Sequence, residues 1–310
     1  MRIESLDPRT LPALPYLRHL ESLINTHLAA VVPGWALPAQ AIVDHLARND
    51  GEYVIDPWVE ARRTLAAVDG YRVLAAVHLL RYGDGPQVGP DYRRLGEINW
   101  VLGHPDRPQA TAAVLRAAHE QLSSWGVARR ASVPSLPVPV FSGVPDTWPH
   151  IATALTEAGY APRPECGEAI YGGRLDAVPL PGQPPLPGIE VRRVAGSDGV
   201  RFVAVFEAEE VGVCECAPDL TRGGALPACR GWAELCEMWV EGAWRGRGVG
   251  TWLVRHAVRW LRLAGCDRIV LAVAAADEAA GAGRFYQRFG WDVLVRELRA
   301  WHPAAAEPAA

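Results

Sequence analysis

The stretch WVEGAWRGRGVGT, residues 239–251, is the part of the chain around which the rest is organised. It lies between a predicted strand over 233–240 and a predicted amphipathic helix over 251–264. Three of its four glycines, Gly246, Gly248 and Gly250, stand at alternating positions. Glycine lets the backbone curve closely, and a helix N-terminus offers unpaired N–H groups and the positive end of its dipole. The stretch therefore predicts a phosphate or pyrophosphate site.

Charge supports this interpretation, because Arg245 and Arg247 flank Gly246. The plainer alternative is an ordinary tight turn. A dinucleotide-binding fingerprint is disfavoured, because Leu253 stands where its third glycine would be.

Around this turn, the second half of the chain has an α/β pattern. Hydrophobic runs predict strands over 189–194, 201–206, 211–216, 233–240, 268–273 and 291–298. Helical spacing predicts helices over 251–264 and 279–289. The run over 268–273 is continuously apolar, which indicates a buried central strand.

The first half has a similar order of elements. We expect helices over 11–30, 38–48 and 110–125, and strands over 64–68, 72–80 and 96–102. Asp69-Gly70 predicts the turn of a hairpin. A segment with five prolines, residues 176–188, predicts a linker between the halves. The expected domains are therefore 1–175 and 189–300, with a disordered tail over 301–310.

Composition excludes several function classes. The 310 residues suggest two domains. All 31 Lys+Arg residues are Arg, so a Schiff-base lysine and a lysine-bearing P-loop are both excluded. The net charge of -4 argues against a general nucleic-acid binder.

Targeting and redox signals are weak. We see no signal peptide and no apolar run long enough to span a membrane, so we expect a cytoplasmic protein. The composition looks like that of a GC-rich bacterial genome. Six cysteines are too few for a secreted disulfide framework. A zinc site is disfavoured, because Cys214 and Cys216 do not form a CxxC pair, and we expect no metal.

Two motifs in the second half carry a family resemblance. Arg245-x-x-Gly248-x-Gly250, between a strand and a helix, resembles the acyl-CoA-binding motif of the GNAT N-acetyltransferases. Downstream, the run from Phe285-Tyr286 to Gly290-Trp291 looks like the second signature of that family. The resemblance covers residues 189–298. It implies a mixed α/β sheet and acetyl-CoA as the co-substrate.

The resemblance also implies which residues contact acetyl-CoA. Those expected to bind it are Trp239, Val240, Arg245, Gly246, Arg247, Gly248, Val249, Gly250, Thr251 and Phe285.

Acyl transfer to an amine needs a base, a stabilised oxyanion and an acid for the leaving thiolate. The resemblance places Tyr286 at the acid position. Glu234 is our preferred base and Glu237 its rival. Strict alternation along a strand puts these two glutamates on opposite faces, so only one of them would face the cleft. Solvated glutamates and a core tyrosine are the plainer alternatives.

The first half is interpreted as a degenerate copy of the second. Residues 102–112 align with residues 240–250, with Arg107 opposite Arg245 and alanines, Ala110 and Ala112, in place of two glycines. Leu155 stands where Tyr286 stands. The architecture is therefore similar to tandem-GNAT proteins such as mycothiol synthase, with one active half.

The resemblance implies an N-acetyltransferase that moves an acetyl group from acetyl-CoA to a small-molecule primary amine, directly, in a ternary complex. The alternative is a non-catalytic acyl-CoA-binding or regulatory module. We expect no nucleic-acid or membrane partner, and a monomer or homodimer.

Overall fold

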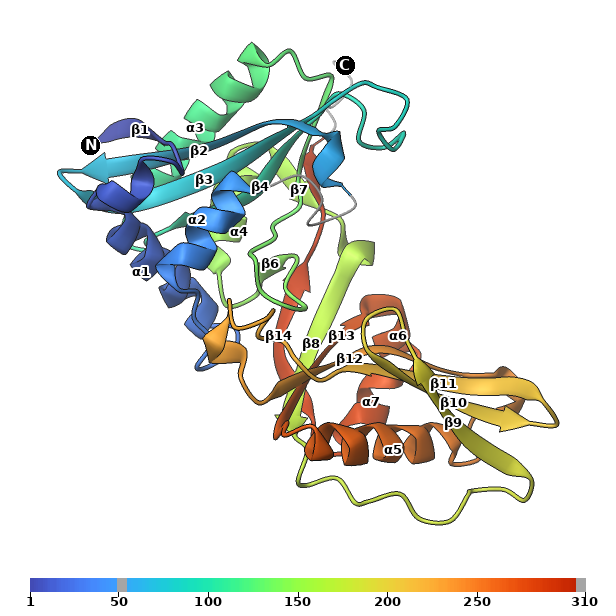
Figure 1. The fold of residues 1–310 in the computed structure, drawn as a ribbon. Helices are drawn as coiled ribbons and strands as arrows, with labels where there is room; N and C mark the ends of the chain where they lie inside the picture. Colours follow the sequence, from blue (N-terminus) through green and yellow to red (C-terminus); the bar gives the residue numbers. More distant parts are fainter. Residues whose placement is uncertain (49–54, 305–310) are drawn as a thin grey trace. The chain divides into compact units, whose positions relative to one another are not determined.

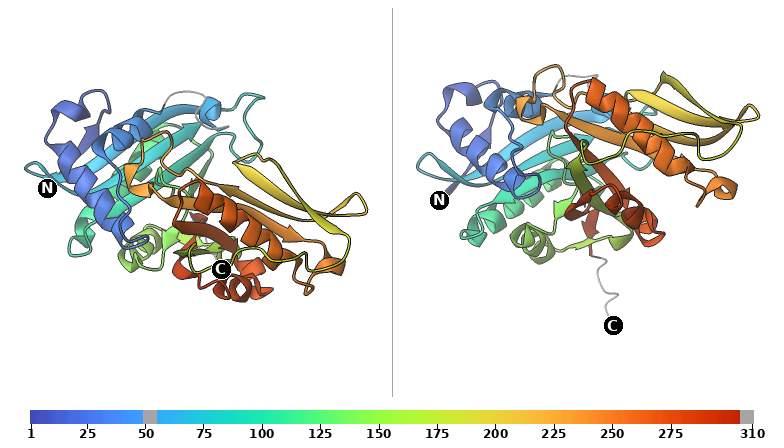
Figure 2. Two further views of the ribbon diagram at one scale, coloured as in Figure 1. Left: turned by 60° about the horizontal axis from the view of Figure 1, so that its bottom comes forward. Right: turned by 90° about the horizontal axis from the view of Figure 1, so that it is seen from below.

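A computed structural model describes residues 1–48 and 55–304, and it has the expected mixed α/β fold. The chain forms two compact units, Met1–Glu168 with Val295–Ala310, and Ala169–Leu294. Each unit is built on one sheet (Figures 1 and 2).

The first unit has a seven-stranded sheet in the order β1-β2-β3-β4-β5-β15-β7. Its strands are β1 (Arg2–Leu6), β2 (Val59–Asp69), β3 (Arg72–Tyr82), β4 (Leu95–Gly103), β5 (Arg129–Ser132), β7 (Tyr160–Pro162) and β15 (Trp301–Pro303). Its helices are α1 (Tyr16–Ala29), α2 (Ala39–Ala47), α3 (Pro108–Ser124) and α4 (Pro149–Glu157). Helices α1 and α2 lie against one face of the sheet and α3 against the other (Figure 1).

The sheet of the second unit runs β14-β8-β13-β12-β11-β10-β9, and β6 (Val144–Pro145) pairs with the end of β14. Its strands are β8 (Gly167–Arg174), β9 (Ile189–Ala195), β10 (Val200–Phe206), β11 (Glu209–Ala217), β12 (Trp232–Val240), β13 (Arg268–Ala274) and β14 (Asp292–Leu298). Its helices are α5 (Val249–Leu263), α6 (Ala275–Ala279) and α7 (Ala282–Gln287).

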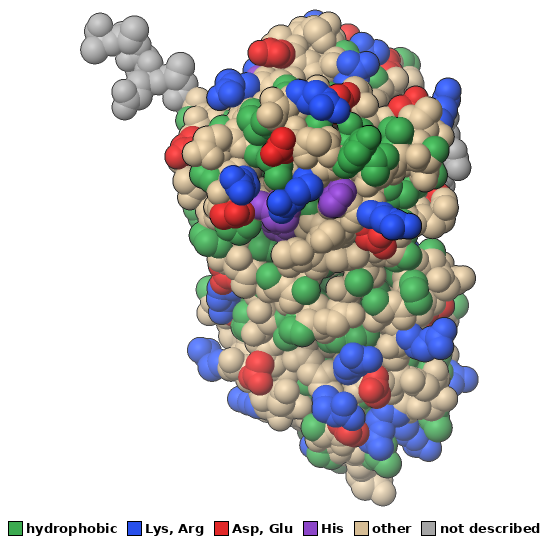
Figure 3. All heavy atoms as spheres, turned by 90° about the vertical axis from the view of Figure 1, so that its left-hand side faces the viewer, with side chains coloured by type: hydrophobic (Ala, Val, Ile, Leu, Met, Phe, Trp, Pro, Cys, Tyr) green, Lys and Arg blue, Asp and Glu red, His purple; other side chains and the backbone are tan. Residues whose placement is uncertain are grey.

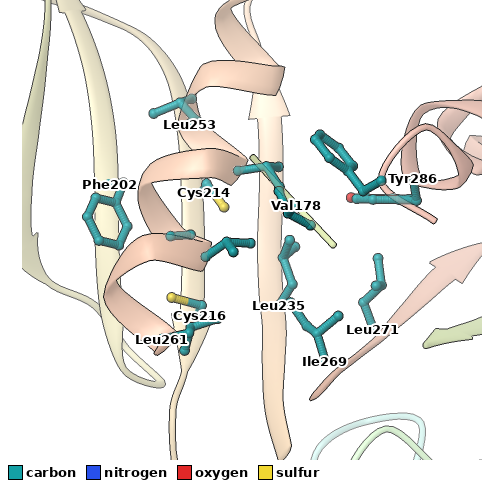
Figure 4. Packing of buried hydrophobic residues seen from close by; sticks show 14 of the residues in the cluster. Val178, Phe202, Cys214, Cys216, Leu235, Leu253, Leu261, Ile269, Leu271 and Tyr286 are labelled. Carbon is teal, nitrogen blue, oxygen red and sulfur yellow. The ribbon is translucent and has the colours of Figure 1, made fainter. Parts of the chain in front are cut away.

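Helix α5 covers one face of this sheet because its apolar residues recur at helical spacing. Leu253, Ala257 and Leu261 are all buried, and they pack against strand residues such as Cys214 and Leu235 (Figure 4). Gly265 ends the helix with a left-handed backbone, φ 87°, as a C-terminal glycine does.

The last strand of each half lies in the sheet of the other half. β8 precedes the proline-rich segment in the chain, yet it lies between β13 and β14. β15, at the end of the chain, lies between β5 and β7. Because of this exchange, the compact units do not divide at 176–188, and residues 295–304 belong with the first unit.

Two expectations need correction. Residues 301–303 of the expected disordered tail form β15, in which Trp301 is buried against the first unit; residues 305–310 lie outside the described part. The helix expected over 279–289 is shorter, since α7 covers only Ala282–Gln287 and is separated from α6 by Gly281, which has φ 106°.

Candidate active site

A cleft opens in the second unit where two parallel strands diverge. β12 and β13 pair only from Trp232 opposite Arg268 to Glu234 opposite Val270. Beyond this point a cavity of about 820 Å³ occupies the opening. Its lining comes from β12 (235–240), the following turn and α5 (244–246 and 248–251), β13 (272–274), and α6, α7 and their flanks (277, 280–282, 285, 286 and 288).

The glycine-rich turn leads from β12 into the N-terminus of α5. Gly248 is the N-cap with φ 88°, and Gly246 has φ 72°, so both adopt a conformation that other residues rarely adopt. The first turn of a helix has no intrahelical acceptors for its N–H groups. Val249, Gly250 and Thr251, which form that turn, line the cavity. The turn can therefore hold an anion at the mouth of the cleft.

Gly250 is needed for close packing rather than for its backbone angle. A Cβ there would lie 3.0 Å from Met238 Cε and 3.5 Å from Phe285 Cε2. The helix start, β12 and α7 therefore meet closely at this side of the cleft.

The two arginines of the turn have different surroundings. Arg245 lines the cavity, and its Nε donates a hydrogen bond of 2.8 Å to the Val240 carbonyl oxygen. The Arg247 guanidinium lies over the Trp244 ring, 5.1 Å from its centroid. Among the described residues Arg247 is not part of the cavity lining.

A β-bulge at Cys236 overturns the expected alternation of the two glutamates. Along β12, Glu237 lies opposite Glu215 of β11, but Leu235 lies opposite Cys216, so Cys236 is an extra residue. Leu235 and Met238 both pack on the α5 side. Glu234 and Glu237 therefore share the face of the sheet away from α5.

The two glutamates have contrasting environments. Burial raises the pKa of Glu234, and the nearby Asp198 raises it further, against an opposing effect of Arg222. Glu237 forms an ion pair with Arg201 of β10 and lines the cavity. Glu234 lies just before the strands diverge and is not among the described lining residues.

Tyr286 lies on α7 and lines the cavity. Its hydroxyl points toward β12 (Figure 4). Its ring stacks on Trp291, with centroids 6.1 Å apart. Burial raises its pKa, and Cys214 and Asp277 add to the effect. The phenol therefore keeps its proton at neutral pH.

The structure brings most of the expected residues to one cavity. Those lining it are Glu237, Trp239, Val240, Arg245, Gly246, Gly248, Val249, Gly250, Thr251, Phe285 and Tyr286. The sequence did not place Cys236 or Arg201 at the site, and Glu215 stood out only as one of several acidic residues before the glycine turn, because strand pairing across β10, β11 and β12 brings the three together. Of these, only Arg201 and Glu215 had a signal, which was charge within predicted strands.

The first unit has the same strand geometry, but a different segment of chain lies beside the equivalent part of β4. β4 pairs with β5 only over Leu95–Ile98, and Asn99 is an extra residue in β4, as Cys236 is in β12. Here, however, the segment after β5 lies beside β4, since the Ser135 N–H donates a hydrogen bond of 2.7 Å to the Asn99 carbonyl oxygen. A Cβ at Gly103 would also collide with Thr111 of α3.

The expected alignment of the two turns is corrected by this register. Gly103, not Leu102, corresponds to Val240, because each lies four residues after its bulge. The turn over 104–107 is then half as long as the turn over 241–248. Arg107 is the N-cap of α3, the position that Gly248 has in α5, so it is not the counterpart of Arg245.

The described residues contain neither a membrane-spanning helix nor a cluster of metal ligands. No helix there is both long and apolar enough to cross a membrane. No group of three or more His, Cys, Asp or Glu residues in 1–48 and 55–304 could hold a metal ion. Arginines and carboxylates are interspersed on the face shown in Figure 3.

Residues 178–291 match the acetyltransferase (GNAT) family. Comparison with curated proteins gave no match. Among solved structures, a tandem GNAT protein from the clavulanic acid biosynthesis pathway aligns with TM-score 0.62 and 15% identity, covering 99% of each chain. A GCN5-related N-acetyltransferase from Sphaerobacter thermophilus aligns with TM-score 0.62 and 16% identity over 100% of this chain and 97% of the other.

A third structure is the GCN5-related glucosamine N-acetyltransferase region of a fungal multi-domain GH3 β-N-acetylglucosaminidase. It has TM-score 0.61 and 16% identity, and the match covers 97% of this chain and 38% of the other. At these identities the likeness shows the fold. Residues 178–291 therefore carry a domain of the GNAT acetyltransferase family, and the chain as a whole has the tandem GNAT fold.

Proposed function

We propose that the protein transfers an acetyl group from acetyl-CoA to a small-molecule primary amine, directly, in a ternary complex. The observation that carries this proposal is the joining of three features in one cavity. These are the glycine cradle at α5, the opening beside the Cys236 bulge, and the Tyr286 phenol.

The residues present suit acetyl-CoA. The N–H groups of Val249 and Gly250 would hold its pyrophosphate at the helix N-terminus. The splayed edge of β12 would accept the pantetheine arm. Acetyl-CoA supplies an activated acetyl group as a thioester, and the amine attacks its carbonyl carbon.

The protein's own groups would manage the protons. Glu234, with its raised pKa, would accept a proton from the acceptor's ammonium group through water. The amine nitrogen then forms the new C–N bond while the C–S bond breaks. Backbone N–H groups left unpaired at the bulge would stabilise the oxyanion. Tyr286 would protonate the departing thiolate and then regain a proton from the positively charged nitrogen, which leaves a neutral amide and a free thiol.

Direct transfer is favoured over an acyl-enzyme at the one cysteine in the cavity lining, Cys236. Burial, with Glu234 and Asp198 next, raises the pKa of Cys236 to about 12. A thiol with this pKa is almost entirely protonated at neutral pH, and the thiolate is the nucleophile.

Calorimetric titration with acetyl-CoA tests the first half of the proposal. We expect one molecule per chain, because the turn after β4 is short and without glycine, and the Ser135 N–H is bonded to the Asn99 carbonyl oxygen of β4. Thiol release is then measured with spermidine, tyramine and glucosamine; glucosamine is included because a structural neighbour is described as acting on it. Binding without turnover of any amine would favour the non-catalytic module, and no binding would contradict both.

A further inference from the structure

The cavity has two sides, separated by β12. Met238 and Val240 face the α5 side, where a Cβ on Gly250 would lie 3.0 and 3.4 Å from them. Glu237 and Trp239 face the other side, and Trp239 packs there on a small group of β-strand valines. If acetyl-CoA occupies the cradle side, as the proposed function requires, the amine must approach past Glu237 and Trp239.

A row of charged residues crosses three strands on this second side. Arg201 of β10 lies opposite Glu215 of β11, and Glu215 lies opposite Glu237 of β12. Two carboxylates on neighbouring strands repel each other. Arg201 offsets this repulsion, because its Nε lies 3.5 Å from Glu215 Oε2 and its Nη2 pairs with Glu237 Oε2.

Glu215 is held firmly in place and anchors this row of charged residues. Its side chain is 3% exposed, and its Oε1 accepts a hydrogen bond of 2.7 Å from the Asp198 N–H. Gly196 leaves space for it, since a Cβ there would collide with the carboxylate. Arg201 is therefore anchored at Glu215 and reaches from there to Glu237, whose side chain is 43% exposed.

We propose that Glu237 binds the ammonium group of the acceptor amine, and that Arg201 is a positioning residue that holds this carboxylate in place at the cavity. The acceptor is accordingly a cationic primary amine. A carboxylate has several acceptor positions, so Glu237 can bind Arg201 through Oε2 and an ammonium group through Oε1. Because Glu237 binds the ammonium group, Glu234 remains as the base. The inference rests on the proposed function.

Other charged or titratable groups lie around the site. They are Glu234 and Cys236 on β12, Asp198 in the turn before β10, Asp277 on α6, and Arg245 and Arg288 around the cavity. None of them is altered in the variants below, so their effect is constant within the comparison.

The test compares the KM and kcat of each amine with the Kd of acetyl-CoA for each variant. Glu237→Gln should raise the amine KM about ten-fold or more, with a smaller effect on kcat and an unchanged acetyl-CoA Kd. Arg201→Gln should also raise the amine KM, by about five-fold, with a smaller effect on kcat, because Arg201 then no longer holds the Glu237 carboxylate beside Glu215. Arg201→Lys should largely restore the normal KM.

Arg193→Gln is the matched control, since it removes an exposed guanidinium from β9 whose register partner, Phe202, packs on the α5 side. A wild-type amine KM in Arg201→Gln, or an equal loss of acetyl-CoA affinity, would overturn the inference while leaving the proposed function intact. If wild type binds no acetyl-CoA or uses no amine, the proposed function fails first. Should Arg201→Gln not fold, Glu215→Gln replaces it, and it should also raise the amine KM, because Arg201 loses its anchor at Glu215.

Discussion

At the scale of single residues, the Tyr286 hydroxyl is the group most directly tied to chemistry. Tyr286→Phe should lower kcat about 10²-fold, because the leaving thiolate loses its proton donor. The acetyl-CoA Kd should hardly change, since the ring and its stacking on Trp291 remain. Tyr171→Phe is the control: it removes a neighbouring hydroxyl that donates to Glu278 at 2.7 Å. Equal rate losses in both variants would contradict the role of Tyr286.

The raised pKa of Glu234 predicts how kcat/KM depends on pH. Its raised pKa means that the carboxylate form needed for catalysis appears only above the usual range of a glutamate. We therefore expect kcat/KM to rise with pH through this pKa. Asp198→Asn removes a charge that raises the pKa, so the rise should move to lower pH. Glu234→Gln should lower kcat/KM about 10²-fold and abolish the rise. A profile unmoved by Asp198→Asn would count against Glu234 as the base.

At the scale of elements, the start of α5 should be sensitive to any side chain. Gly248→Ala places a Cβ at φ 88° and 3.3 Å from Pro185 Cβ, which costs about 1–2 kcal/mol of backbone strain. We expect weaker acetyl-CoA binding by calorimetry. Gly265→Ala is the matched control, because it has φ 87° at the other end of α5 with open space around it. It should cost similar stability, seen as Tm, without changing acetyl-CoA affinity.

Elements defined by local pattern could be predicted from the sequence. The strand before the glycine turn, the helix after it and the hairpin at Asp69-Gly70 are all present, because each depends on residues next to each other in the chain. The bulge at Cys236 could not be predicted, since it is defined by pairing with β11. Its consequence is large: one extra residue moves Glu234 to the same face as Glu237.

The same limit explains the missed strand β8. Its residues, GEAIYGGR, contain three glycines and lack a clear alternating pattern. The strand is stabilised by its place between β13 and β14, which are far away in the sequence. Long-range pairing of this kind overrides weak local preference.

At the scale of the whole molecule, the exchanged strands predict that the halves depend on each other. A chain ending at Leu180 would keep β8 but lose β15 from its own sheet, and the complementary chain would lose β8. Each missing strand leaves unpaired backbone groups on both neighbours, and such edges favour aggregation. Neither fragment alone should give a cooperative melting transition or bind acetyl-CoA.

Mixing or co-expressing the fragments should restore acetyl-CoA binding, because each supplies the strand that the other lacks. The matched control is the full chain with a protease site inserted after Leu180, which is 57% exposed in the proline-rich segment. Cut after folding, this protein should keep both its Tm and its acetyl-CoA affinity, because the strands are already exchanged. If residues 181–310 alone bind acetyl-CoA as tightly as the full chain, β8 is dispensable, and the second unit does not need the first half of the chain.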